Sequence, residues 1–319
     1  MNQLYRALHM PPGRLLRKLS GEKEIYTIAV RPRPQAEGCS PLPALGGTAY
    51  TPLPYTPGVW YADPLLFHWD GKRYLFCEAF EDKTGRGAIA VTELQDDGRM
   101  EQPHVVLREE FHLSFPTVFA WQDEIWMLPE TSADHAINLY RCVEFPDRWE
   151  RAKRFPVRQE ICDIILTDKQ RMGLALLCSE TKPENGLYTR YRRYELVRDE
   201  DPMEEDPPEF QLLEDEPFNL QHRVYDLGSR NAGPLFFRNE RWVHPTQVST
   251  TVDYGVYLQF FEQRGASEVP LCAATPQNVR ITGILSGDLI GIHSYCCDDQ
   301  LEVIDARYLR RVEKGSSSC

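Results

Sequence analysis

Short strand-like runs and a repeated hairpin predict an all-β protein folded as a five-bladed β-propeller. Runs rich in Val, Ile, Phe, Tyr and Trp alternate with turn residues along the chain, and helical periodicity is weak almost everywhere. Successive blades are expected at intervals of roughly fifty residues, a spacing typical of propellers. Five stretches are interpreted as blade starts: 58–82, 111–132, 160–181, 228–249 and 275–297.

The first two stretches contain the same hairpin, with an acid at its end. In each, a Pro begins an apolar run, a Trp and polar residues form the turn, and a Glu ends the second run. The interval is 14 residues in both copies, from Pro64 to Glu78 and from Pro116 to Glu130. A repeat of this kind favours a propeller, in which polar residues at one end of every repeat gather at the end of a shared channel.

Turn positions predict which residues face each other across each hairpin. A two-residue turn at Asp70-Gly71 would place Asp63 opposite Glu78, and Asp163 holds the corresponding place in the third stretch. The same arithmetic predicts further opposed pairs: Phe115 with Glu130 around Gln122-Asp123, Asn231 with Val248 and Ala232 with Gln247 around Asn239-Glu240, and Arg280 with His293 around Ser286-Gly287.

In a closed ring, the strand ends far from these turns converge on one mouth of the channel. Directly opposed residues have Cβ atoms about 5 Å apart, so their polar groups would form one cluster. The residues expected there are Asp63, Glu78, His112, Ser114, Glu130, Asp163, Arg230, Asn231, Gln247, Arg280 and His293.

The two ends of the chain are expected to close the ring. Residues 24–30 and 301–309 are strand-like and could share a terminal blade. We therefore expect one propeller over 24–310 and a C-terminal tail over 311–319. A basic N-terminal extension over 1–23 would be a solvated segment or an amphipathic surface helix. An acidic, Pro-rich stretch at about 199–217 is expected to be a solvated loop insertion.

Composition excludes several classes of function. The net charge of −12 and the lack of a basic face argue against nucleic-acid binding. No apolar run is long enough for a transmembrane segment, and no secretory signal is evident. The nine cysteines are scattered without a CxxC pair, which favours a reduced, cytoplasmic protein with neither a metal site nor a cofactor.

A concave opening that mixes carboxylates with His, Asn, Gln and Arg suits a polyhydroxylated ligand. Sugar hydroxyls need donors and acceptors, and Trp60, Tyr61 and Phe115 could stack on the apolar face of a sugar. Glycoside cleavage needs two carboxyl groups with different pKa values; a separation of about 5–5.5 Å predicts retention and about 6.5–9.5 Å inversion.

A structural interpretation competes for each residue taken alone. An Asp before Pro often caps a turn, a Glu at a strand end often pairs with Arg, and His112 and His293 could be satisfied core histidines. Arg230 could clamp an anion or form a salt bridge between blades. Repeated polar residues at one hairpin end would nevertheless be costly to bury without a function.

Ordered motifs along the chain resemble a known family. The stretches YADPLLF…YLFCEAF, HLSFPTVF…IWMLPET, INLYRCVEFPDRW, RNAGPLFF…HPTQ and GIHSY…EVIDA resemble the propeller region that precedes the transferase domain in plant glucosamine inositolphosphorylceramide transferases. Stand-alone bacterial proteins carry the same region. The resemblance covers about residues 24–309 and implies a five-bladed propeller distantly related to the arabinanase, levansucrase and invertase glycosidases.

The resemblance to these glycosidases also implies roles for individual residues. Asp63 matches the Asp that acts as base or nucleophile on the first blade, and Asp163 matches the Asp that tunes the acid on the third. The acid expected on a later blade is missing, because Gln247 ends the fourth stretch; geometry then leaves Glu130 or Glu78 as substitutes.

Two functions follow from this sequence. The first is a glycosidase-like propeller that cleaves or transfers a glycosyl unit. Its catalytic residues would be Asp63, Glu130 and Asp163, and its substrate-binding residues Glu78, His112, Ser114, Arg230, Asn231, Gln247 and His293. The second is a non-catalytic protein that binds a glycan, a glycolipid or a sugar nucleotide in surface-polysaccharide or glycolipid synthesis, with a glycosyltransferase as a candidate partner.

Overall fold

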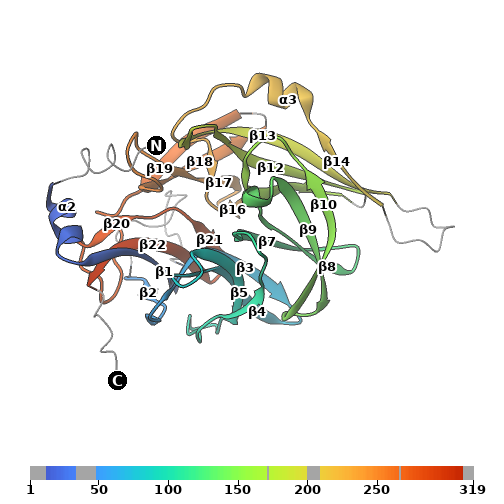
Figure 1. Cartoon of the computed structure of the whole chain (residues 1–319). Coiled ribbons are helices and arrows are strands. Elements are labelled where there is room, and N and C mark those ends of the chain that lie inside the picture. Colours follow the sequence, from blue (N-terminus) through green and yellow to red (C-terminus); the bar gives the residue numbers. More distant parts are fainter. Residues whose placement is uncertain (1–11, 34–47, 171, 200–208, 266, 312–319) are drawn as a thin grey trace.

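Five antiparallel sheets are arranged in a ring, which makes the protein a five-bladed β-propeller (Figure 1). The computed structural model describes residues 12–33, 48–170, 172–199, 209–265 and 267–311. The predicted all-β class and blade number are confirmed. The strands that begin successive blades contact one another around the axis, as β3 does with β7 and β7 with β11. The starts of these strands therefore meet at one end of the ring.

Blades 1 to 3 are regular four-stranded meanders. Blade 1 consists of β3 (Val59–Trp69), β4 (Lys72–Glu81), β5 (Arg86–Glu93) and β6 (His104–Leu107). Blade 2 consists of β7 (Ser114–Trp121), β8 (Glu124–Glu130), β9 (Ala136–Glu144) and β10 (Arg148–Pro156), with the short η1 (Ser132–Asp134) after β8. Blade 3 consists of β11 (Ile161–Lys169), β12 (Gly173–Lys182), β13 (Asn185–Asp199) and β14 (Glu209–Glu214).

Blades 4 and 5 each begin with an interrupted strand. Blade 4 consists of β15 (Arg230–Asn231), β16 (Phe236–Arg238), β17 (Arg241–Val248), β18 (Tyr257–Arg264) and β19 (Ser267–Ala274). Blade 5 consists of β20 (Leu289–Gly291), β21 (Tyr295–Cys297), β22 (Leu301–Arg311), β1 (Glu22–Pro32) and β2 (Thr51–Pro52).

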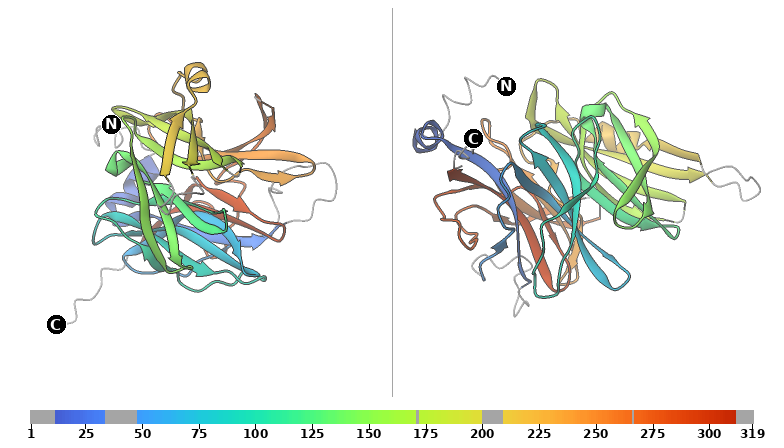
Figure 2. Two further views of the ribbon diagram at one scale, coloured as in Figure 1. Left: turned by 90° about the vertical axis from the view of Figure 1, so that its right-hand side faces the viewer. Right: turned by 60° about the horizontal axis from the view of Figure 1, so that its bottom comes forward.

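The two ends of the chain close the ring as expected. β1 pairs antiparallel with β22 along its whole length, from Glu22 opposite Arg311 to Pro32 opposite Leu301. Figure 2 shows these two strands side by side at the junction of the first and last colours of the chain. Their hydrogen bonds hold a strand from each end of the chain in one sheet, so both ends of the chain build blade 5.

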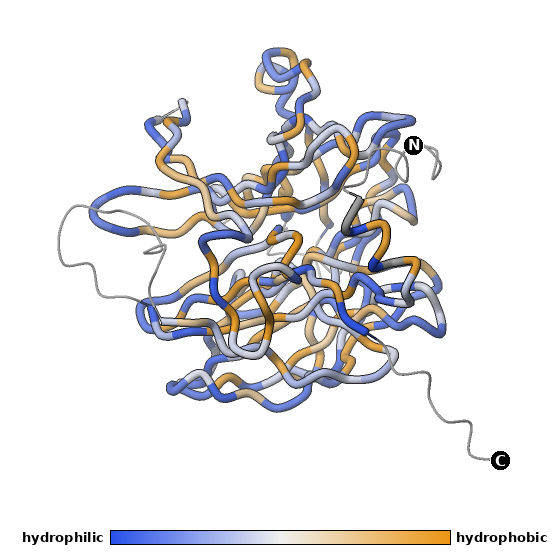
Figure 3. Tube along the Cα trace, turned by 90° about the vertical axis from the view of Figure 1, so that its left-hand side faces the viewer, coloured by the Kyte–Doolittle hydropathy of each residue, from blue (hydrophilic) through white to orange (hydrophobic). Residues whose placement is uncertain are grey.

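Apolar side chains fill the spaces between neighbouring blades. Between blades 2 and 3, for example, Trp126 and Leu128 pack with Leu176 and Tyr194, all of them nearly inaccessible. Hydrophobic residues accordingly lie within the sheets and hydrophilic residues at the turns and loops (Figure 3). The cluster next to blade 4 is smaller, with Phe115, Ile165 and Leu177 at its centre. Burial of this apolar surface supplies most of the driving force for blade packing.

The segments outside the blades differ in part from the expected boundaries. The basic extension forms α2 (Pro12–Leu19), and β1 begins at Glu22, within the expected extension. Arg14 and Arg17 of α2 form ion pairs with blade 5, while residues 1–11 lie outside the described part of the chain. A surface helix, one of the two alternatives, is thus present.

The acidic stretch is not wholly a loop. Residues 200–208 and the C-terminal residues 312–319 lie outside the described part of the chain. Within the stretch, β14 pairs with β13, and α3 (Glu216–Gln221) begins at Asp215, whose side chain accepts a hydrogen bond from the backbone of Phe218. The strand forms because Phe210 is buried against blade 2, where it packs on Trp126. Within the described ranges, no helix is long and apolar enough to cross a membrane.

Candidate functional site

The first strands of blades 1 to 3 share a bulge at the same height. Asp63, Phe115 and Asp163 have positive φ angles of 51°, 43° and 47°, and strand pairing shifts register beside each of them. Residues other than Gly rarely adopt this conformation, and it persists only where surrounding contacts hold it. The bulge turns these three side chains out of the regular alternation of their strands.

The bulges correct two of the predicted pairings. Both turns are confirmed, since Trp69 pairs with Lys72 and Trp121 with Glu124. Beyond the bulge, however, Ala62 rather than Asp63 faces Glu78. In blade 2, Ser114 rather than Phe115 faces Glu130. A bulge inserts one extra residue in one strand, so each predicted partner is displaced by one position.

Blade 4 departs further from the predicted register. The predicted turn at Asn239-Glu240 is confirmed, since Arg238 pairs with Arg241. The predicted pair of Ala232 with Gln247 is wrong, because Gln247 faces Arg230. The predicted pair of Asn231 with Val248 is likewise wrong, because Asn231 faces Thr246. The cause is the break between β15 and β16.

Gly233 allows that break. It has a φ of 151°, and a Cβ there would collide with the carbonyl oxygen of Tyr295 in blade 5. Only a residue without a side chain can bring the backbones of the two blades so close together.

In blade 5 the predicted hairpin at Ser286-Gly287 does not exist. β20 and β21 both pair with β22, so the turn lies at residues 298–301, where the Asp298 carboxylate accepts hydrogen bonds from the backbone N–H groups of Gln300 and Leu301. Arg280 is exposed, its backbone carbonyl accepts a hydrogen bond from Tyr50, and it does not face His293.

One side of the mouth is a hydrogen-bonded group of residues from blades 1 and 5. His293 Nδ1 lies 2.5 Å from Asp305 Oδ2 and 3.8 Å from Asp63 Oδ1. Ser294 Oγ donates to Asp63 Oδ1 at 2.7 Å, and the backbone N–H of Asp63 donates to Asp305 Oδ2 at 3.1 Å. Asp305 thus ties the first strand of blade 1 to blade 5 and orients both His293 and Asp63.

The other side of the mouth is centred on an ion pair between blades 3 and 4. Arg230 Nε donates to Asp163 Oδ2, and Arg230 Nη2 lies 3.7 Å from Glu130 Oε2. Gln247 Nε2 lies 3.4 Å from the same Asp163 oxygen and 3.3 Å from the Tyr254 hydroxyl. Arg230 therefore compensates two of the three predicted catalytic carboxylates.

Glu78 lies between these groups and has very different surroundings. Its side chain is only 6% exposed, and Oε1 has no hydrogen-bond partner among the described residues. His112 Nε2 is 3.5 Å from that oxygen. Burial, and then the negative charge of Asp63, raise the pKa of Glu78 well above its ordinary value of 4.5. Both influences favour the neutral, proton-donating form of this carboxyl group.

The remaining carboxyls differ according to their partners. Burial raises the pKa of Asp163, and the opposing effect of Arg230 leaves it at about 7. Burial also raises the pKa of Asp63, although His293 counteracts this. Burial acts in the same direction on Asp305, but His293 outweighs it and holds the pKa of Asp305 below its ordinary value. Titratable groups in one site whose environments separate their pKa values are typical of acid–base chemistry.

Aromatic rings form a row along the mouth. His293 stacks on Tyr26 with ring centroids 4.7 Å apart, Tyr26 lies 5.1 Å from Trp60, and Trp60 stacks on Phe80 at 4.4 Å. His112 follows Phe80 at 6.2 Å. Trp60 is therefore placed as the sequence predicts, whereas Tyr61 packs in the core between blades 5 and 1. Rings beside carboxylates provide both the apolar and the polar contacts that a sugar needs.

A loop of blade 4 covers part of the mouth. The Arg230 guanidinium lies 4.9 Å from the centroid of the Tyr254 ring, and that ring packs edge-on against His293. The neighbouring residue Asp253 is held by Arg14 of α2 and by Arg307 of blade 5. As a result, Arg230 is only 12% exposed.

The structure brings most of the predicted residues together, with two exceptions besides Arg280. Asn231 is inaccessible, and its side chain spans the junction of blades 3 and 4, where it donates to the carbonyls of Asp163 and Leu177 and lies 2.9 Å from His244 Nε2. Ser114 is buried beside Glu130. The geometry gives Asn231 a role in packing between blades.

Three residues of the mouth, Asp305, Ser294 and Tyr254, are not among those predicted from the sequence. Asp305 is a carboxylate within the apolar run of residues 301–309, and that exception to the pattern is a signal that could have identified it. Ser294 follows a predicted residue, His293, and only the structure reveals its hydrogen bond to Asp63. Tyr254 lies in a loop, where no periodicity indicates the direction of a side chain.

Among the residues that the structure describes, two groups have the composition of a metal site. The ligand atoms of Asp63, His293 and Asp305 lie within 4.8 Å of one another, and so do those of Glu130, Cys162 and Asp163. In the first group His293 and Ser294 already contact the carboxylates, and in the second Arg230 does. These contacts compensate the carboxylates without a metal ion, so we assign no metal to either group.

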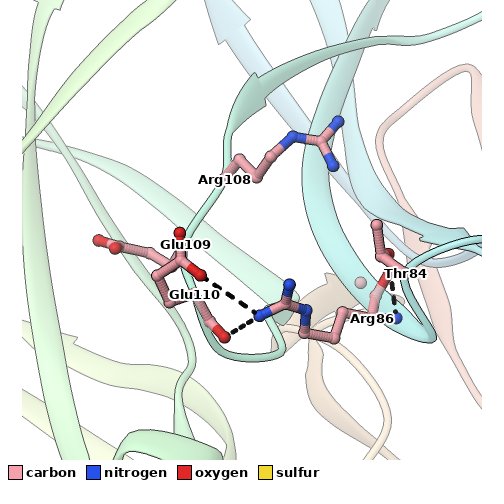
Figure 4. A pocket seen from close by; sticks show the side chains of 6 residues that line it. Thr84, Arg86, Arg108, Glu109 and Glu110 are labelled. Carbon is pink, nitrogen blue, oxygen red and sulfur yellow. Dashed lines mark hydrogen bonds and ion pairs between the residues drawn. The ribbon is translucent and has the colours of Figure 1, made fainter.

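Several cavities among the described residues lie outside the central mouth, and two of them are next to the blades that form it. A polar pocket of about 200 Å³ between blades 1 and 2 includes Gly87, Arg86 and Arg108, and Figure 4 shows Arg86 reaching across it to Glu110. A groove of about 1020 Å³ between blades 3 and 4 includes Tyr191 and Trp242. The polar pocket adjoins the site, because Gly87 also donates its backbone N–H to His112.

Comparisons with solved structures give distant neighbours. The catalytic domain of a GH62 α-L-arabinofuranosidase from Coprinopsis cinerea is 9% identical with a TM-score of 0.47, and covers 77% of this chain and 90% of that one. An α-L-arabinofuranosidase from Lactobacillus brevis is 13% identical with a TM-score of 0.46, over 76% of this chain and 80% of that one.

Sequence comparison identifies the family. Glucosamine inositolphosphorylceramide transferase 1 of Arabidopsis thaliana is 39% identical over 98 residues, and that of Oryza sativa subsp. indica is 36% identical over 98 residues. Each match covers 30% of this chain and 13% of the relative, so this chain matches only a small part of those proteins. The family model described as glucosamine inositolphosphorylceramide transferase 1, N-terminal, matches residues 48–265. The chain belongs to this family.

Proposed function

We propose that the protein binds a carbohydrate at the mouth of the propeller and cleaves or transfers a glycosyl unit there. The observation that carries the proposal is the contrast between Glu78 and its neighbours. Glu78 is a buried carboxyl in ion-pair contact with no Lys or Arg among the described residues, while Asp63 accepts a hydrogen bond from Ser294 and lies near His293. A neutral carboxylic acid beside a carboxylate is the combination that glycosyl chemistry requires.

In this proposal Glu78, rather than Glu130, is the general acid. Arg230 Nη2 lies 3.7 Å from Glu130, and Ser132 Oγ donates to its other oxygen at 2.9 Å. Glu130 therefore already has a guanidinium and a hydroxyl as partners, whereas Glu78 Oε1 has no hydrogen-bond partner among the described residues. Asp63 is then the base or nucleophile, and Asp163 with Arg230 sets the electrostatics of the site.

The ligand is proposed to be a glycan, a glycolipid headgroup or a sugar nucleotide. The mouth offers carboxylate acceptors, the Arg230 and Gln247 donors, and the row of rings that includes Trp60. The relatives that share the family are named glucosamine inositolphosphorylceramide transferase 1. A glycosyltransferase is therefore the proposed partner, and the cytoplasm the proposed location.

A second candidate function is binding without catalysis. The ion pair of Arg230 with Asp163 favours it, because this pair compensates a carboxylate that would otherwise tune the reaction. Gln247, rather than an acid, faces Arg230 on the next strand. In that case the same residues would hold a sugar and no bond would break.

A glycan and sugar-nucleotide screen tests both candidates. Wild type, Asp63→Asn and Glu78→Gln are compared for binding and for turnover. Asp70→Asn is the matched control, since Asp70 is an exposed residue with positive φ in the same hairpin as Asp63. If the protein is an enzyme, Asp63→Asn and Glu78→Gln lower kcat by about 10²–10⁴-fold while binding persists.

The outcomes separate the two functions. Ligand binding without turnover in the wild type supports the binding protein. Equal turnover in wild type and Asp63→Asn contradicts the role of Asp63. If no member of the screen binds to the wild type, both functions are rejected for these ligand classes.

A further inference from the structure

A buried oxygen of Glu78 and a fixed imidazole N–H face each other across the boundary of blades 1 and 2. Glu78 Oε1 has no hydrogen-bond partner among the described residues, and the nearest polar atom recorded for it is His112 Nε2 at 3.5 Å. That distance exceeds a full hydrogen bond by a few tenths of an ångström. The contact needs only a small movement to form.

The backbone fixes which nitrogen of His112 carries the proton. The N–H of Gly87 donates to His112 Nδ1 at 2.9 Å, so Nδ1 has to be an unprotonated acceptor. In a neutral imidazole the proton then resides on Nε2, the nitrogen that faces Glu78. Burial, only partly offset by the charge of Asp63, lowers the pKa of His112 and keeps the ring neutral.

The absence of a side chain at Gly87 makes this arrangement possible. A Cβ at this position would lie 2.5 Å from Glu78 Oε1 and 2.9 Å from His112 Cε1, and would also collide with the carbonyl oxygen of Leu113. The φ angle of Gly87 is not in the left-handed region, so close approach rather than backbone conformation explains the glycine. Blade 1 thus leaves space for a residue of the next blade to reach its buried acid.

We propose that His112 is a positioning residue for Glu78: its Nε2–H binds Glu78 Oε1, directs the acidic proton to Oε2, and then holds the carboxylate. This rests on the proposed function. As the glycosidic C–O bond breaks, its electron pair goes to the leaving oxygen, which takes the proton from Glu78 Oε2. With Asp63 as the nucleophile, the anomeric carbon forms its new bond to the Asp63 carboxylate, and the negative charge left on Glu78 is stabilised by the His112 N–H. The attacking water or acceptor hydroxyl then displaces Asp63 from that carbon and gives its proton to Glu78. With Asp63 as the base instead, the water or hydroxyl bonds to the anomeric carbon directly and gives its proton to Asp63, and Glu78 regains a proton from solvent. Hydrogen bonds to an ionised acceptor are shorter and stronger than neutral ones, so the 3.5 Å contact should close while Glu78 is ionised.

Two variants of His112 separate positioning from packing. His112→Ala removes the donor, whereas in His112→Gln the side-chain amide N–H can approach the position of Nε2. His104→Ala is the control, because His104 is an exposed histidine at the edge of blade 1 that contacts only Asp147 among the ion pairs of the described residues. Infrared spectra of each variant, taken against the same variant carrying Glu78→Gln, report the titration of Glu78 without any need for turnover.

We expect His112→Ala to raise the pKa of Glu78 by about one unit, because a donor to the charged form is lost. With a substrate, kcat falls by about 10–100-fold with KM nearly unchanged, and its pH profile shifts in the same direction. His112→Gln is expected to restore both the pKa of Glu78 and kcat toward their wild-type values. An unchanged titration in His112→Ala, or a shifted titration with unchanged kcat, overturns the positioning role. If the wild type turns over no substrate, the proposed function fails, and the titration still decides whether His112 donates to Glu78.

Discussion

Two buried glutamates, Glu78 and Glu302, lie in the same propeller with opposite surroundings. Glu302 is inaccessible, and its carboxylate contacts Arg31 at 2.9 Å, Arg238 at 3.4 Å and the Tyr50 hydroxyl at 3.2 Å. Glu78 is almost as deeply buried but faces the uncharged ring of His112 and the carboxyl group of Asp63. Burial alone therefore does not distinguish a structural carboxylate from a functional one, whereas the set of partners does.

The difference follows from the positions of the two residues in the ring. Glu302 is the second residue of β22, where Arg31 of the paired strand β1 and Arg238 of blade 4 converge on it, so its charge joins the closing blade to its neighbour. Glu78 lies near the bulged ends of the first strands, where Asp63 and Asp163 are also directed by their positive φ angles. Other carboxyl groups are gathered around Glu78, whereas groups of opposite charge surround Glu302.

Removing the charge of Glu302 should give the largest effect on stability. Glu302→Ala leaves Arg31 and Arg238 buried without their carboxylate, which typically costs about 3–5 kcal/mol of unfolding free energy. Chemical denaturation measures this loss. Glu195→Ala is the control, because Glu195 is exposed on β13. A loss below about 1 kcal/mol would show that the Glu302 cluster does not hold the ring closed.

Asp163 should make stability depend on pH. Its pKa is raised from 3.8 to about 7, so the folded state binds this proton more tightly than the unfolded state. The resulting stabilisation is present below pH 3.8 and is lost as the pH rises through about 7, with a slope of at most about 1.4 kcal/mol per pH unit.

The difference in unfolding free energy between wild type and Asp163→Asn should therefore change across this interval, to the disadvantage of the wild type as the pH rises. Asp168→Asn, an exposed Asp on the same strand, should show no such change. Parallel curves for wild type and Asp163→Asn would indicate that Arg230 holds Asp163 ionised throughout.

Gly87→Ala should destabilise the protein by about 1–3 kcal/mol, the usual cost of overpacking. The new Cβ would meet Glu78 Oε1 and His112 Cε1, so blades 1 and 2 would have to move apart. Gly186→Ala is the matched control, since Gly186 is an exposed glycine of β13 with nothing within 4 Å of an added Cβ. Equal stability of the two variants would contradict close packing around Glu78.

Glu78→Gln should have the smallest effect, within about 1 kcal/mol at acidic pH, because it replaces a neutral acid with a neutral amide of similar shape. As the pH rises above 4.5, the stability that wild type gains from its raised pKa is lost, and the variant becomes relatively more stable. Thermal unfolding at several pH values follows this difference, with Glu93→Gln on the neighbouring strand as control. A variant that loses stability at high pH would mean that Glu78 has a charged partner.

Turn chemistry made part of this fold predictable from the sequence. Asp70-Gly71 and Asn239-Glu240 form the turns that were expected, and so the blades and most residues of the mouth were identified. The register near the mouth was wrong, because Asp63 and Phe115 adopt positive φ angles without the glycine that usually signals them. These angles are imposed by contacts between blades, which no local pattern reveals.

The strand pairing of blade 5 could not be predicted from the sequence in the same way. Its first strand is split, and its turn depends on the side chain of Asp298 instead of a Gly pair. The pairing of Asp305 with His293 depends on that turn. The partners of Glu78 and Glu302 were equally hidden, since Arg31, Arg238 and His112 come from other strands and blades. The sequence could therefore suggest which carboxyl groups lie at the mouth, but not which of them have no Lys or Arg partner.

The protonation state of Glu78 at neutral pH tests the central claim most directly. Infrared difference spectra between wild type and Glu78→Gln at pH 7 would show whether a protonated carboxyl group is lost, and the same comparison with Glu302→Gln provides the paired carboxylate as reference. We expect a protonated carboxyl band that disappears in Glu78→Gln and persists in Glu302→Gln. A spectrum in which Glu78 is ionised at pH 7 would contradict its assignment as the acid.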